Sequence, residues 1–258
     1  MAAFCLFHLL SFAQTNSGVA TYQYVDAFGQ PTVFKLYFNQ EKSIYIANRG
    51  KKNTLNKVGE VVLTQSNFSE VTSVNKTIFD YFIDEEGDVI VQDRKNNKLT
   101  IREVQSHYPL IVREPTLPKI NWQLTEQHKK IGKFNCQKAT ATFRGRNYEA
   151  WFTPEIPIPA DPWKLHGLPG LILEAQDTEK KYTYTFVDIT MPLAQNAADE
   201  LNYTPKTGDE IKLTDYNKEV NNRIKEHWRA LISKPAARGS NLTFTPSDID
   251  PQELNFEQ

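Results

Sequence analysis

The feature that most constrains this chain is a series of short segments in which apolar and polar residues alternate. Between Val19 and Pro118 these segments are rich in Tyr, Phe, Ile, Val and Thr. A period of two residues is typical of strands that bury one face. The predicted strands are 19–25, 32–38, 43–47, 77–83, 89–93, 99–104 and 110–113, with one more near 61–63 inside a longer polar connection over 48–75. Glycine or asparagine in the turns at 27–31, 84–88 and 95–98 predicts hairpins between neighbours.

A second group of alternating segments follows, at 122–126, 137–143, 148–153, 171–175 and 182–189. No long helical pattern separates these segments. Parallel strands need a crossover connection, which is usually a helix. We therefore expect a mainly β protein built on one large, curved antiparallel sheet, either open or a half-barrel.

One helical pattern lies near the C-terminus. Apolar residues recur there at steps of four, four and three residues: Val220, Ile224, Trp228 and Leu231. This spacing predicts an amphipathic helix over 215–233, with Thr214 as its N-cap and Pro235 as its stop. Such a helix needs an apolar surface, so we expect it to pack on the concave face of the sheet.

The N-terminus has the pattern of an export signal. Residues 1–13 are mostly apolar and end in Ser11-Phe12-Ala13, an A-x-A-like cleavage site before Gln14. A positively charged first part is missing, so we interpret Met1 as lying inside a longer signal peptide. The alternative is a short buried helix. After cleavage Cys136 is the only cysteine left, which excludes an internal disulfide.

Charge and hydropathy exclude two classes of partner. The chain has 30 Lys and Arg against 31 Asp and Glu, a formal net charge of -1. This balance gives no field that attracts nucleic acid or an anionic membrane. No apolar run after the first residues reaches the roughly 18 residues that span a bilayer, so we expect no transmembrane segment in the mature chain. We divide the chain into the signal peptide at 1–13, one β-rich domain at 14–235 and a polar tail at 236–258.

Residues 131–177 carry a family resemblance. They contain Lys-Phe-Asn-Cys-Gln-Lys-Ala, Trp-Phe-Thr-Pro and Pro-Trp-Lys-Leu-His, followed by the run Gly167, Leu168, Pro169, Gly170, Leu171 and Ile172. This region resembles the GLPGLI family, exported bacterial envelope proteins named for those six residues. One departure is Asp161, where the family usually has glycine. The resemblance implies export and a β-rich fold, and it implies no catalytic residues.

The motif itself predicts a turn and a buried strand. Leu168-Pro169-Gly170-Leu171 fits a type II turn, in which proline sets φ at the second position and glycine accepts a positive φ at the third. The apolar run that follows predicts a core strand covered on both faces. Three prolines stiffen residues 153–159, so we expect a rigid surface loop there.

Four residues around this loop are candidate ligand-binding residues: Arg146, Trp151, Trp163 and His166. The aromatic side chains either seal the core or form a rim that contacts a ligand. Arg144 and Arg146 flank Gly145 in a predicted hairpin and form the best small cationic site, although turn arginines often only aid solubility.

Catalytic chemistry finds little support in the sequence. Cys136 and His166 would make a thiol and its base, but neither lies in a context that activates a cysteine. The histidines are scattered and no metal-binding motif occurs. We assign no catalytic residue, no metal ligand and no cofactor.

Three functions remain open. The first is an exported envelope protein, periplasmic or extracellular, that binds an apolar small molecule, a lipid, a peptide or an envelope protein partner. The second is a hydrolase or peptide-modifying enzyme with its site around Trp151–His166. The third is a structural surface component.

Overall fold

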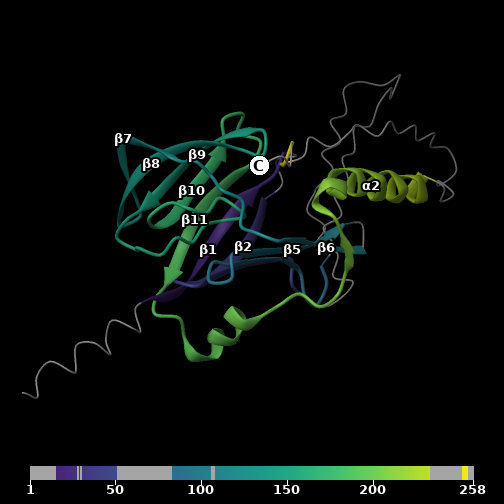
Figure 1. Cartoon of the computed structure of the whole chain (residues 1–258), viewed down its shortest axis with the longest axis horizontal. Coiled ribbons are helices and arrows are strands. Elements are labelled where there is room, and N and C mark those ends of the chain that lie inside the picture. Colours follow the sequence, from purple (N-terminus) through teal and green to yellow (C-terminus); the bar gives the residue numbers. More distant parts are fainter. Residues whose placement is uncertain are drawn as a thin grey trace, which may run out of the picture.

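The computed structural model describes residues 16–27, 29, 31–50, 83–105, 108–232 and 252–254 of the chain. Twelve strands in this part of the chain form one mixed, open sheet (Figure 1). The predicted mainly β fold is therefore confirmed. The predicted signal peptide, the strand near 61–63, almost all of the strand at 77–83 and the helix stop at Pro235 lie outside the described residues.

The sheet contains the following strands: β1 (Ser17–Val25), β2 (Pro31–Asn39), β3 (Lys42–Ala47), β4 (Asp88–Asp93), β5 (Lys98–Gln105), β6 (Tyr108–Glu114), β7 (Gln123–Ile131), β8 (Phe134–Phe143), β9 (Arg146–Thr153), β10 (Leu171–Asp177), β11 (Thr183–Thr190) and β12 (Asp209–Ile211). All except β12 overlap a strand predicted from alternation. The turns behave as their residues predict, since Gly87 and Asn97 both have positive φ.

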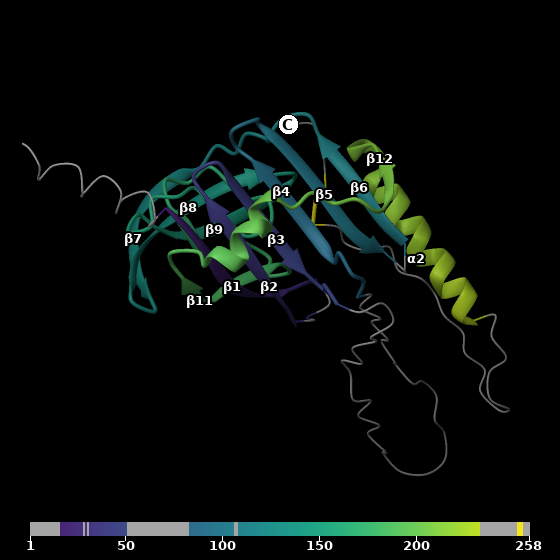
Figure 2. The same cartoon turned by 90° about the horizontal axis from the view of Figure 1, so that it is seen from below.

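Two antiparallel meanders make up most of the sheet. One runs from β1 to β6 and the other from β7 to β11, and β1 joins them by pairing with β11. The spatial order is β12-β6-β5-β4-β3-β2-β1-β11-β10-β9-β8-β7. Seen from below, β7–β11 curl round one end while β4–β6 extend away from them (Figure 2). The curl creates an inner face on which a core can form.

The sheet is not wholly antiparallel, because β12 pairs in parallel with β6. The chain reaches that edge without a long crossover helix. It leaves β11, forms the short 3₁₀ helix η1 (Gln195–Asn202), and passes against β2 and β3. The Glu86 carboxylate then accepts hydrogen bonds from the backbone N–H groups of Lys206 and Thr207, which fixes the approach to β12. The prediction of a wholly antiparallel sheet missed β12, because this short edge strand is positioned by hydrogen bonds to Glu86 and not by a crossover helix.

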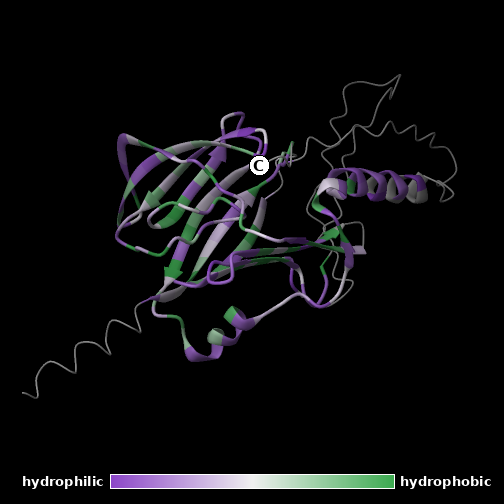
Figure 3. Ribbon diagram, in the orientation of Figure 1, coloured by the Kyte–Doolittle hydropathy of each residue, from purple (hydrophilic) through white to green (hydrophobic). Residues whose placement is uncertain are grey.

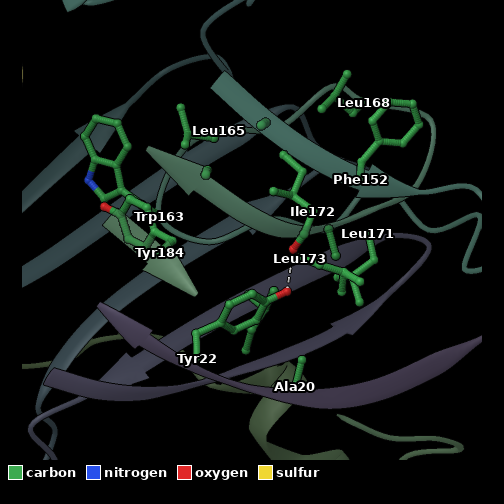
Figure 4. Close-up of a cluster of buried hydrophobic side chains, with 14 of the residues drawn as sticks. Ala20, Tyr22, Phe152, Trp163, Leu165, Leu168, Leu171, Ile172, Leu173 and Tyr184 are labelled. Carbon is green, nitrogen blue, oxygen red and sulfur yellow. Dashed lines mark hydrogen bonds between the residues drawn. The ribbon is translucent and has the colours of Figure 1, made fainter. Parts of the chain in front are cut away.

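The core lies on the inner face of the curled strands. Hydrophobic and hydrophilic residues alternate along the strands (Figure 3). Tyr22 stacks on Phe34 with ring centroids 5.1 Å apart, and its hydroxyl donates to the carbonyl of Ile172 at 2.6 Å (Figure 4). Leu171, Ile172 and Leu173 are all buried, so β10 is the predicted core strand covered on both faces.

The segment at 154–170 fills the inner face, which corrects in part the prediction of a surface loop over 153–159. Pro154, Glu155 and Pro157 are exposed as expected, but the residues between and after them turn inward. Six apolar residues of this segment are buried: Ile156, Ile158, Ala160, Trp163, Leu165 and Leu168. The N–H groups of Ile158 and Ala160 bond to carbonyls two residues back, at 2.8 and 2.7 Å. Pro157 and Pro159 directly precede these two residues and have no N–H to satisfy. The segment can therefore enter the core because few of its backbone donors need a partner.

Gly170 is required for a reason other than the predicted type II turn. Its φ is not positive, and Gly167 is the glycine of this motif with a positive φ, at 103°. A Cβ on Gly170 would lie 2.2 Å from the carbonyl oxygen of Thr153. Glycine is needed there because the backbone of β9 passes too close for any side chain.

The predicted helix is present as α2 (Tyr216–Ile232), preceded by the 3₁₀ turn η2 (Leu213–Asp215). It packs at the end of the sheet formed by β5, β6 and β12 (Figure 2). The Tyr216 hydroxyl bonds to the Glu103 carboxylate, and Arg223 bonds to Asp209 at 3.0 Å. The expected cover over the concave face is supplied by residues 154–170 and not by this helix.

Candidate functional site

The four candidate ligand-binding residues do not form one site. Arg146 and Trp151 both belong to β9, but they are an odd number of positions apart, which places them on opposite faces of the strand. Arg146 is buried and pairs with Asp177 at 3.4 Å. Trp151 is half-buried, and the ammonium of Lys129 lies 4.5 Å from its ring centroid.

Trp163 and His166 both belong to the segment that fills the core. Trp163 is buried with φ at 60° and packs edge-on against Phe143 at 5.9 Å. His166 is half-buried, its Nδ1 lies 3.1 Å from the carbonyl oxygen of Lys164, and burial lowers its pKa. Trp163 seals the core, which is one of the two roles that the sequence left open.

The thiol of Cys136 is poorly suited to nucleophilic chemistry. Its side chain is buried, and burial raises the pKa of the thiol to about 11. The thiol is therefore protonated at neutral pH, whereas the thiolate is the reactive form. Glu155, the nearby carboxylate, accepts hydrogen bonds from the backbone and side chain of Asn135.

A cluster of buried charges lies where three distant segments meet. Arg144 occupies the turn between β8 and β9 with φ at 50°, and its Nη2 donates to Glu114 Oε2 at 2.5 Å. Lys164, from the core-filling segment, lies 4.0 Å from Glu114 Oε1. All three side chains are at most 5% exposed. We call Glu114, Arg144 and Lys164 the carboxylate site, because they surround a fourth residue, a glutamate from the C-terminal region.

That glutamate is Glu253, in a segment that the sequence assigned to a polar tail. Lys164 donates to Glu253 Oε2 at 2.5 Å, and Arg144 Nε lies 3.6 Å from Glu253 Oε1. Only 4% of the Glu253 side chain is exposed. We call Gln252, Glu253 and Leu254 the tail segment. Glu253 is buried and Gln252 is half-buried against the curled sheet, whereas the side chain of Leu254 is exposed.

The neighbours of Glu253 are held as well. Gln252 donates to the Tyr184 hydroxyl at 2.7 Å, and the hydroxyl of Tyr148 donates to the Gln252 carbonyl at 3.4 Å. The backbone of the segment is fixed on both sides of the glutamate. Asn217 at the start of α2 donates to the Glu253 carbonyl at 2.7 Å, and the Leu254 N–H donates to the Arg144 carbonyl at 2.8 Å. The side chains of Gln252 and Glu253 and the main chain of the tail segment are thus all bound.

The charges of the carboxylate site favour the presence of the Glu253 carboxylate. Burial raises the pKa of Glu114, while the cations Lys164 and Arg144 oppose that rise. With Glu114 ionised, the carboxylate site carries two positive charges and one negative charge. Glu253 brings the sum to zero, and a buried charge without a partner is strongly destabilising.

Sequence reasoning found one member of this site and missed the others. Arg144 was part of the predicted cationic pair with Arg146, but both arginines are buried and not exposed in a turn. Lys164 directly follows Trp163 in the segment Pro-Trp-Lys-Leu-His, and its place between apolar residues was a signal that it could be buried. Nothing in the alternation around Glu114 or in the polar sequence around Glu253 marks either as a buried ion.

A second buried polar pair lies deeper. Gln92 on β4 donates to Asp161 Oδ2 at 2.7 Å and to the Trp163 carbonyl at 2.9 Å. Asp161 Oδ1 and Gln92 Oε1 have no hydrogen-bond partner in the described part of the protein. Burial raises the pKa of Asp161 to about 8, although the hydrogen bond from Gln92 and the charge of Arg94 oppose this. Asp161 is therefore mainly protonated at neutral pH.

Neither a metal-binding cluster nor a membrane-spanning helix occurs in the described residues. They contain no group of three or more His, Cys, Asp or Glu side chains arranged to hold a metal ion. In the same part of the chain, no helix is long and apolar enough to cross a membrane.

The family model described as "Protein of unknown function (Porph_ging)" matches residues 144–174. This stretch runs from Arg144 of the carboxylate site through the core-filling segment into β10. It contains Lys164 but neither Glu114 nor Glu253. Comparison with curated proteins gives no match.

The solved structures to which this chain is similar share little sequence with it. PNGF-II, solved in space groups C2 and P21, is 16% identical with a TM-score of 0.49 in both cases. The match covers 80% of this chain and 32% and 33% of the two PNGF-II chains, so this chain spans about a third of that protein's length. An uncharacterized conserved protein from Thermus thermophilus is 10% identical with a TM-score of 0.39, over 82% of this chain and 99% of the other.

Proposed function

We propose that this chain is an exported cell-envelope protein that binds a polypeptide segment at the carboxylate site. The observation that carries the proposal is the way in which Gln252–Leu254 is held. A short segment lies against elements far away in the sequence, and its backbone and the side chains of Gln252 and Glu253 are bound. A peptide ligand is recognised by the same combination of contacts.

Export rests on the sequence. Residues 1–13 have the apolar core and small-residue ending of a signal peptide. The run at 167–172 is the string for which the exported GLPGLI family is named, and the family match at 144–174 overlaps it. We place the protein in the periplasm or outside the cell.

A polypeptide is a better partner than an apolar small molecule. An apolar ligand or lipid would need room on the inner face of the curled sheet. Residues 154–170 occupy that face with buried side chains of their own, including Ile158, Trp163 and Leu165. The polar and charged groups of the carboxylate site are at the end of the sheet, around the tail segment.

An enzymatic site around Trp151–His166 has less support. Trp163 packs against Tyr148, which lies on the opposite face of β9 from Trp151, so the two tryptophans do not share a rim. Glu155 and Cys136 are engaged as described above. A purely structural role is the main competing interpretation, because the tail segment also ties the C-terminal region to the sheet.

Peptide binding decides between these interpretations. The probe is a fluorescein-labelled peptide of residues 248–258, titrated into full-length protein and followed by fluorescence anisotropy. In Glu253→Gln the chain's own segment has lost its charge, so the peptide should displace it and bind. Wild-type protein should bind at least about tenfold more weakly, because its intact segment competes from within the molecule.

The control is a scrambled peptide of the same composition and charge. Binding of the original peptide but not of the scrambled one supports the proposal. Equal binding of both peptides, or no binding to Glu253→Gln, would mean that the tail segment is only a structural strap.

A further inference from the structure

We propose that the carboxylate site selects a glutamate side chain, so that its ligand is a polypeptide segment with a glutamate at the position of Glu253. This inference rests on the proposed function, and it names the chemical group by which the partner is recognised. The chain's own tail segment is then one occupant of the site, held in place until a competing segment replaces it.

The charge balance points to an anion. Arg144 and Lys164 are both at least 97% buried, and Glu114 supplies a single negative charge beside them. Without an occupant, the site holds two buried cations and one buried anion. A neutral or cationic side chain would leave the extra positive charge uncompensated, whereas a carboxylate neutralises it.

The geometry points to a planar carboxylate. The two oxygens of Glu253 are directed at different cations, Oε2 at Lys164 and Oε1 at Arg144. Lys164 donates a charged hydrogen bond to Oε2, which is stronger than a neutral one, and Arg144 adds an ion pair at 3.6 Å to Oε1. An amide in the same place offers only one acceptor oxygen, and its NH₂ group would face a cation.

The fixed backbone selects the length of the side chain. Hydrogen bonds from Tyr148 to the Gln252 carbonyl and from Asn217 to the Glu253 carbonyl hold the main chain on both sides of the Glu253 side chain. The distance from that backbone to Lys164 is therefore set by the site, and two methylene groups bridge it. Aspartate is one methylene shorter, so its carboxylate would not reach Lys164 without moving the segment.

The first test restores a carboxylate to an empty site. Full-length Glu253→Ala keeps only the Cβ of the side chain, and propionate supplies a carboxylate on a two-carbon chain. Anything that binds the native state alone raises the melting temperature. We expect about 100 mM propionate to raise the melting temperature of Glu253→Ala above that in equimolar sodium chloride. Propionamide, the neutral isostere, should have no such effect, and Lys164→Met/Glu253→Ala should lose the response.

A second measurement applies if Glu253→Ala does not fold. Full-length Glu253→Gln keeps the side-chain volume and is titrated with three peptides of residues 248–258, carrying Glu, Asp or Gln at position 253. We expect the Glu peptide to bind at least about tenfold more tightly than either of the others.

The outcomes separate this inference from the proposed function. Equal binding of the three peptides, with no binding of a scrambled one, overturns glutamate selection and leaves polypeptide binding in place. Propionate rescue without binding of any peptide supports the carboxylate site and overturns polypeptide binding. A melting temperature that responds equally to propionate and propionamide overturns the inference.

Discussion

Lys164 Nζ lies 2.5 Å from Glu253 Oε2, although 89 positions separate the two residues in the chain. Both side chains are almost completely buried, and Glu114 and Arg144 complete the cluster. Burial removes water that would otherwise screen these charges, so each ion depends strongly on its neighbours. The stability of the end of the sheet should therefore depend on all four charges together.

Replacing Lys164 tests this dependence. Lys164→Met leaves two buried carboxylates beside the single cation Arg144, and we expect it to lower the free energy of unfolding by about 3–5 kcal/mol. Adding Glu253→Gln removes one of the two buried negative charges. The double variant should be more stable than the sum of the single changes implies, by about 1–3 kcal/mol in urea titrations. Simple additivity of the two effects would show that the pair is not coupled.

Substitution of Gly170 tests whether its backbone lies too close to that of Thr153 for any side chain. Gly170→Ala places a Cβ against the Thr153 carbonyl, and we expect a loss of about 1–3 kcal/mol in the free energy of unfolding. Gly170→Asn should cost at least as much. If the glycine were needed for a positive φ, asparagine would instead be tolerated.

A matched control for this prediction is Gly132→Asn. Gly132 has φ at 56°, and no atom lies within 4 Å of the position that its Cβ would take, so asparagine should be accepted with little change. Equal losses at both glycines, measured by chemical denaturation, would contradict the argument.

The raised pKa of Asp161 should make the stability of the folded protein depend on pH. Burial raises its pKa from 3.8 to about 8, so between these values the folded protein holds a proton that the unfolded chain releases. The free energy of unfolding contributed by this group therefore falls as pH rises through that window. Asp161→Asn is neutral at every pH and should become progressively more stable relative to wild type between about pH 5 and pH 8, as urea titrations at several pH values can measure.

The comparison of Asp161→Asn with wild type also controls for Asp88. Burial raises the pKa of Asp88 to about 7, which acts in the same direction in both proteins and cancels in their difference. A stability difference that does not change with pH would show that Asp161 is ionised in the folded state.

Cys136 should be inert while the protein is folded. Its thiol is buried and has a pKa of about 11, so neither access nor ionisation favours alkylation. Iodoacetamide at about pH 8 should label Cys136 only after unfolding in guanidinium, with mass spectrometry locating the modified residue. Rapid labelling of the native protein would contradict the described burial.

Much of the fold was predictable because alternation directly reports the period of a strand. The strands β1 to β11 all follow from it, and the spacing of apolar residues predicts the helix at Tyr216–Ile232. The strand β12 did not follow, since three residues are too few to show a period and their position depends on Glu86, more than a hundred residues earlier.

The carboxylate site was less accessible to sequence reasoning for a physical reason. Prolines and charges were interpreted as surface features, which is their usual location. Prolines at 154–159 instead allow a segment to enter the core with few unpaired donors, and Lys164 and Glu253 are buried because each neutralises the other. Such pairings between distant residues leave no periodic trace in one sequence.

The most direct measurement is hydrogen exchange at the backbone N–H of Leu254, which donates to the Arg144 carbonyl at 2.8 Å. In full-length wild-type protein, NMR should show this amide protected from exchange. A peptide of residues 248–258 at about 5 mM should speed its exchange by displacing the tail segment, and the same peptide with Gln at position 253 should not. An amide that exchanges freely without any peptide, or one that the glutamate peptide leaves protected, would contradict the account.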